Sequence, residues 1–89
     1  MPRLCNDFHG ISVYLYFKDV DRHHLPHVHV FHGDDEAVVA LDGRVLEGDF
    51  GSTSLKRVRA WLIQEEGGVE AAWELAAAGR PFQRLSSLA

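Results

Sequence analysis

The feature that most constrains the fold is the run HVHVFH at residues 27–32, which directly follows Pro26. Apolar residues alternate with imidazoles in it, and alternation with period two is typical of a β-strand. A strand here would place its two valines on one face and His27, His29 and Phe31 on the other. Imidazoles two positions apart on a strand lie roughly 7 Å from each other. We therefore expect them side by side on the aromatic side of a sheet, away from any helices.

Three further segments predict strands. The run ISVYLYF at residues 11–17 also alternates, with polar-tipped aromatics opposite its aliphatic residues. Asp42-Gly43 is a dipeptide preferred in two-residue type I′ hairpins, and it separates the apolar run 36–41 from the run 44–47. The sequence therefore predicts a four-stranded antiparallel β-meander over residues 11–17, 27–32, 36–41 and 44–47.

The second half of the chain predicts helices. Ser52-Thr53-Ser54 offers N-caps, and an apolar spacing typical of a helix follows over about residues 53–66. Gly67-Gly68 should end this helix, and a second should run over about 69–78. Residues 1–9 resemble an irregular lead-in, and 80–89 a loosely docked tail. The expected architecture is a single α+β domain, residues 1–89, with both helices packed on one face of the sheet.

Composition limits the function classes. The formal net charge of −4 disfavours a general nucleic-acid binder, which needs a positive surface. The single cysteine, Cys5, excludes an internal disulfide framework and fits a reducing compartment. The chain starts without an apolar run of signal-peptide length, and no segment could span a bilayer. We expect a cytoplasmic protein without membrane contact.

His27 and His29 are the main candidates for chemistry. With a carboxylate or a third imidazole from Asp19, His24 or Glu36, they could bind a divalent transition metal such as Zn²⁺, Mn²⁺ or Fe²⁺. Alternatively, one imidazole could act as base and the other as acid at a phosphodiester. The substrate would then be positioned by tyrosines from the neighbouring strand, Tyr14 and Tyr16. A third interpretation is structural, with both histidines half-buried and hydrogen-bonded.

A basic cluster lies near the start of the first predicted helix. It consists of Lys56, Arg57 and Arg59. The cluster could contact the phosphates of RNA or DNA, or a partner protein, although a solvated helix face is the simpler explanation.

The chain resembles a family of small bacterial proteins called domain of unknown function 4160. The matching motifs are FKD at residues 17–19, LPHVHV at 25–30, GDDEAVV at 33–39 and LEG at 46–48, together with Trp61 and Trp73. Leu25 stands where the family has a first proline, and Glu65 where its helix often carries a histidine. The resemblance implies pairing with a second small protein from an adjacent gene, in modules similar to toxin–antitoxin pairs.

The leading functional prediction is therefore one member of a toxin–antitoxin-like or regulatory pair, which uses the His-x-His strand face for binding or catalysis. One alternative is a stand-alone His-dependent ribonuclease or metal-dependent hydrolase. Another is a protein-interaction module with structural histidines. The sequence is compatible with an enzyme and with a binding protein, and with a monomer or a homodimer.

Overall fold

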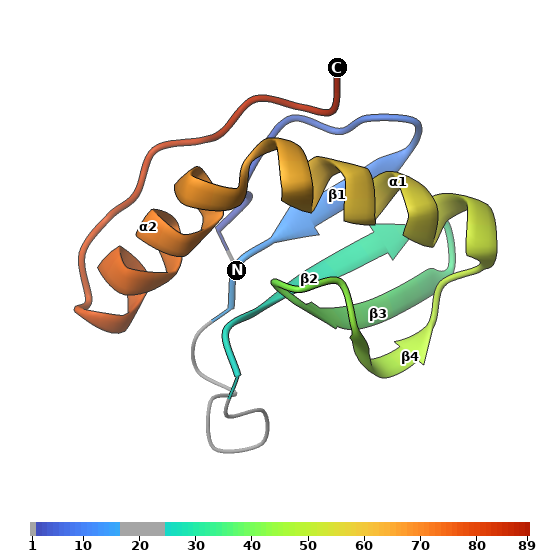
Figure 1. Cartoon of the computed structure of the whole chain (residues 1–89), viewed down its shortest axis with the longest axis horizontal. Helices are drawn as coiled ribbons and strands as arrows, with labels where there is room; N and C mark the ends of the chain where they lie inside the picture. The colour runs from blue at the N-terminus through green and yellow to red at the C-terminus, as the bar shows by residue number, and fades with distance from the viewer. Residues whose placement is uncertain (1, 17–24) are drawn as a thin grey trace.

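The computed structural model describes residues 2–16 and 25–89, in which four strands are followed by two helices (Figure 1). The strands are β1 (Ile11–Tyr14), β2 (His27–His32), β3 (Asp35–Ala40) and β4 (Val45–Asp49). The helices are α1 (Ser52–Gln64) and α2 (Glu66–Ala77). The sheet order is β1-β2-β3-β4, and each neighbouring pair is antiparallel. The predicted α+β meander is confirmed.

The core lies between one face of the sheet and the helices. Strand alternation buries Val13, Val28 and Val30 completely, and Val58 and Trp61 of α1 are equally buried in the same cluster. α1 crosses this face of the sheet, while α2 lies beside the sheet towards the N-terminal segment (Figure 1). Neither helix in the described part of the chain is long and apolar enough to cross a membrane.

The turn between β3 and β4 is not the predicted two-residue type I′ turn. Gly43 has a positive φ of 94°, but Asp42 does not, so only one of the two central residues has the required conformation. The backbone N–H of Gly43 donates to the carbonyl of Ala40, and Ala40 N–H donates to Arg44. These bonds define a three-residue loop, a turn followed by a glycine with positive φ.

The glycine pair does not end the first helix. α1 ends at Gln64, Glu65 leaves helical geometry with φ −108° and ψ 25°, and α2 begins at Glu66. Gly67 and Gly68 therefore lie in the first turn of α2. A Cβ at Gly68 would come within 2.8 Å of the Leu85 side chain, so this glycine permits the close approach of the C-terminal segment.

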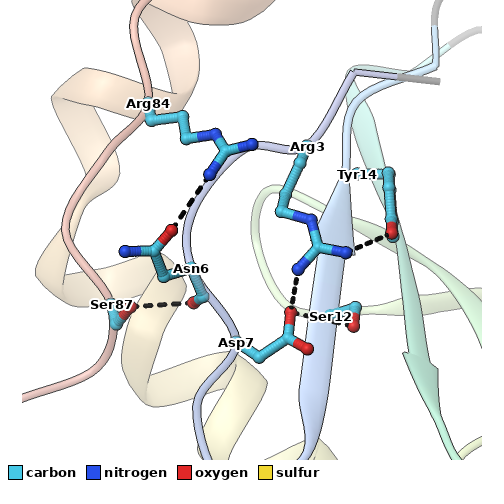
Figure 2. A network of polar contacts seen from close by, with 7 residues as sticks. All are labelled: Arg3, Asn6, Asp7, Ser12, Tyr14, Arg84 and Ser87. Atoms are coloured by element: carbon cyan, nitrogen blue, oxygen red, sulfur yellow. Dashed lines mark hydrogen bonds and ion pairs between the residues drawn. The ribbon is translucent and has the colours of Figure 1, made fainter.

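The C-terminal segment is not loosely docked, and the N-terminal lead-in is part of the core. Leu85 N–H donates to the Leu4 carbonyl at 2.8 Å, and Leu4 is fully buried. Trp61 Nε1–H donates to the Ser86 carbonyl at 2.7 Å. Figure 2 shows the polar side of this contact, where Arg84 and Ser87 bind Asn6. The ends of the chain thus cover the buried indole of Trp61 together.

Candidate functional site

The face of the sheet opposite α1 carries a row of rings. Tyr14 on β1 is the Cα partner of His29 on β2. The His29 ring lies 5.5 Å from that of Tyr16, edge to face, and 5.5 Å from that of His27. Tyr14 makes a similar edge contact with Phe31, also at 5.5 Å. We call Tyr14, Tyr16, His29 and Phe31, all half-buried, the open sheet face.

His27 stands apart from this face in one respect, because it is fully buried. Its Nδ1–H donates to the carbonyl of Leu25 at 2.7 Å, since a carbonyl oxygen can only accept. Its ring lies 5.1 Å from the indole of Trp73 on α2. The prediction that both imidazoles lie away from the helices is therefore wrong for His27. His27 is the first residue of β2, and Trp73 reaches it there.

Beside the row lies a groove of about 320 Å³ in the open sheet face. Its floor is Val38, which is only 5% exposed, and its walls include His29, Phe31 and Glu36. Glu47, which sequence reasoning missed, also lines it. A register shift between Val38 and Val39 leaves Glu47 opposite Val38. The only sequence signal for this irregularity is the glycine that follows Glu47 inside the strand.

The structure brings together part of the predicted metal set. His27 and His29 are adjacent, and Glu36 shares the groove with His29 but pairs with Phe31 across the strands. Asp19 and His24 lie outside the described residues. Within residues 2–16 and 25–89, no group of three histidine, cysteine or acidic side chains could hold a metal ion. The metal site stays a prediction.

Arg3 of the N-terminal segment holds Tyr14 in place, a contact that the sequence pattern did not indicate. Arg3 donates to the Tyr14 hydroxyl at 2.8 Å, and its guanidinium carbon lies 5.3 Å from the centre of the ring. Asp7 in turn accepts hydrogen bonds from Arg3 at 2.6 Å and from Ser12 at 2.9 Å (Figure 2). The Tyr14 hydroxyl is therefore already engaged by a cation, which fixes its position at the edge of the open sheet face.

One side chain of the predicted basic cluster contacts the turn between β3 and β4. Arg59 Nε–H donates to the carbonyl of Gly43 at 2.9 Å, so this side chain braces the β3–β4 turn. Lys56 is exposed and Arg57 is half-buried. Arg59 is exposed as well, so the role of all three residues as a phosphate or partner contact stays a prediction.

Taken together, fold and site define a small α+β protein whose antiparallel sheet has α1 on one face and an aromatic, histidine-containing row on the other, with α2 beside the sheet. The sequence matches the model of the family described as domain of unknown function (DUF4160) over residues 10–74, and the chain belongs to that family. No curated protein and no solved structure matches the chain.

Proposed function

We propose that the protein is a binding protein, one member of a toxin–antitoxin-like or regulatory pair, and that its open sheet face contacts a small partner protein from an adjacent gene. The observation that carries this proposal is the row of half-buried rings on the face opposite α1. Aromatic side chains of this kind are enriched in the centres of protein interfaces, where they bury a large area at low entropic cost.

The burial of His27 favours binding over catalysis at the histidine pair. The residue is fully buried, its Nδ1 is bonded to the Leu25 carbonyl, and its ring lies 5.1 Å from the indole of Trp73. A general acid or base must come within hydrogen-bond reach of its substrate. The half-buried His29 is therefore the histidine of the pair that a partner would contact.

Co-purification with the product of the adjacent gene tests this proposal. His29→Ala should weaken the complex by about tenfold or more, the range found when a central interface side chain is truncated. His32→Ala is a matched control, since His32 is a half-buried histidine of the same strand whose Cα partner is the core residue Ile11. Absence of a complex would contradict the partner assignment. Equal weakening by both variants would contradict the assignment of the face.

A second candidate function is a metal-free ribonuclease in which His29 moves the proton. The edge contact between His29 and Tyr16 favours it, because a tyrosine beside an imidazole could position a phosphodiester. Purified protein should then cleave RNA in the presence of a chelator, and His29→Ala should remove the cleavage while leaving the circular dichroism spectrum unchanged. No cleavage by the wild-type protein would reject this candidate.

A further inference from the structure

A second surface, separate from the open sheet face, combines two adjoining depressions of about 280 and 270 Å³. They lie between the β3–β4 turn, the end of α1 and the start of α2. Both are lined by Leu41, Leu62 and Glu66. We call this continuous surface the trough.

The trough exposes apolar side chains at both of its ends. Ile63 at one end is 77% exposed, and Leu25 at the other end is 42% exposed. Half-buried Leu41 lies in both depressions. A single exposed isoleucine is ordinary, but apolar side chains that line adjoining depressions are typical of a site for another molecule.

The charges along the trough are unequal. On the side of the β3–β4 turn, Asp42 pairs with Arg44 at 2.8 Å, so these two charges offset each other, and the exposed Arg59 of α1 adds a positive charge there. On the side of α2, Glu66 and Glu70 are both exposed and make no ion pair with the described residues. The α2 side is therefore acidic, as is the chain as a whole with its net charge of −4. We call this α2 side the acidic rim of the trough, and its negative charge attracts a basic ligand.

The walls of the trough decide the form of that ligand. Its lining comes from the two helices, the end of β3 with the turn that follows, and the residues just before β2, whereas the edge strands of the sheet are β1 and β4. An extended peptide would need unpaired strand backbone to bind, and the trough offers side chains instead. An amphipathic helix satisfies this arrangement, because its apolar residues lie along one side with charged residues beside them.

We propose that the trough binds an amphipathic helix of a partner protein, with its apolar stripe between Leu25 and Ile63 and its lysine or arginine residues against Glu66 and Glu70. This proposal goes beyond the function proposed for the open sheet face and does not depend on it. It assigns the protein two separate contact surfaces, one aromatic and one apolar with an acidic rim.

Peptide binding followed by NMR tests the proposal. The probe is a synthetic helical peptide of leucine and lysine with apolar residues at helical spacing, compared with the same peptide carrying glutamate in place of lysine. We expect the lysine peptide to shift the amide signals of Leu41, Ile63 and Glu66, and to bind about tenfold more tightly than the glutamate peptide.

Matched variants sharpen the test. Ile63→Gln should weaken binding of the lysine peptide by about tenfold, whereas Ala71→Gln, at an exposed position of α2 outside the trough, should not. The double variant Glu66→Gln with Glu70→Gln should reduce the preference for lysine, and Glu74→Gln should leave it unchanged. All five positions are exposed in the helices, so the melting temperatures should stay near the wild-type value.

Three outcomes would overturn the proposal. One is equal binding of the lysine and glutamate peptides. Another is a set of shifts confined to the open sheet face. A third is concentration-dependent shifts at Leu41 and Ile63 without any peptide, because a second copy of the chain would then occupy the trough. A variant that loses the partner of the open sheet face but still binds the lysine peptide separates the two proposals.

Discussion

The imidazole of His27 lies 5.1 Å from the indole of Trp73, and this contact joins the start of β2 to α2. His27 is fully buried, whereas His29, two residues along the same strand, is half-buried. Two histidines that look equivalent in the sequence therefore have different roles in the fold. His27 anchors the sheet against a helix, and His29 is the one presented on the open sheet face.

His27→Ala should lower the free energy of unfolding by about 2–4 kcal/mol, because it leaves a cavity beside Trp73 and removes the donor to the Leu25 carbonyl. His29→Ala should cost less than about 1 kcal/mol, as is usual for partly exposed positions. Urea unfolding followed by circular dichroism measures both values. Equal losses for the two variants would contradict the difference in their packing.

Gly48→Ala should destabilise the protein by about 2–4 kcal/mol, since a residue with a side chain is strained there and overpacked. Gly48 has a φ of 90°, and an added Cβ would lie 2.4 Å from the carbonyl oxygen of Glu36. Gly51→Ala is the matched control, with a φ of 73° and no atom within 4 Å of the added Cβ. Gly51→Ala should lower the free energy of unfolding by about 1–2 kcal/mol, which is the cost of the backbone strain alone. Thermal unfolding of the two variants separates the steric clash from the backbone strain.

Removal of residues 82–89 should lower the free energy of unfolding by about 2–4 kcal/mol, because apolar side chains of this segment pack on the core. It also removes the carbonyl of Ser86 that accepts from the Trp61 indole. The Trp61 Nε1–H should then exchange with solvent faster in a hydrogen-exchange experiment. An unchanged exchange rate would show that the segment does not protect the indole.

Cys5 should resist alkylation in the folded protein. Burial, with a smaller contribution from the Asp7 carboxylate, raises the pKa of the Cys5 thiol from 9.0 to about 11. The thiolate fraction at pH 8 is therefore about 100-fold lower than for an exposed cysteine, and access is blocked as well. Because its folded-state pKa is raised, the protonated Cys5 thiol contributes to the stability of the fold. This contribution is complete below pH 9.0 and is lost as the pH rises towards 11. Labelling with iodoacetamide at pH 8 with and without urea checks the protection.

Asp42 should titrate below its ordinary pKa of 3.8, chiefly because the backbone N–H of Arg44 donates to its carboxylate at 3.0 Å. The Arg44 side chain contributes less to this lowering of the pKa, so Arg44→Ala should raise the titration midpoint only partly. The resulting stabilisation of the turn is present above pH 3.8 and is lost as the pH falls through the lower folded-state value. Carbon-detected NMR of the carboxyl group follows the titration. A midpoint at 3.8 or above in the wild-type protein would contradict the observed turn.

The sheet could be predicted from the sequence because its information is local. Alternation in residues 11–14 and 27–32 fixes which side chains face the core, and Val13, Val28 and Val30 are buried as that pattern requires. The same local logic places Val58, Trp61 and Leu62 on the buried side of α1. The adjacency of His27 and His29 follows from strand geometry in the same way.

The rest of the site depends on contacts that no local pattern encodes. The burial of His27 depends on where Trp73 of α2 comes to lie. The position of Glu47 depends on a bulge that changes the register between β3 and β4 by one residue. Arg3 reaches Tyr14 because the lead-in pairs with β1, although the lead-in has no alternation of its own. The close approach at Gly68 likewise depends on Leu85, far along the chain.

The bond between Ser87 and Asn6 joins residues 81 positions apart. During synthesis on the ribosome, Asn6 leaves the exit tunnel long before Ser87 has been added, so this contact forms only after residues 6–87 have all been synthesised. Until then the indole of Trp61 lacks the Ser86 carbonyl that accepts its N–H. This domain therefore completes its fold only after residues 86 and 87 have left the exit tunnel, and until then the nascent chain exposes part of its core.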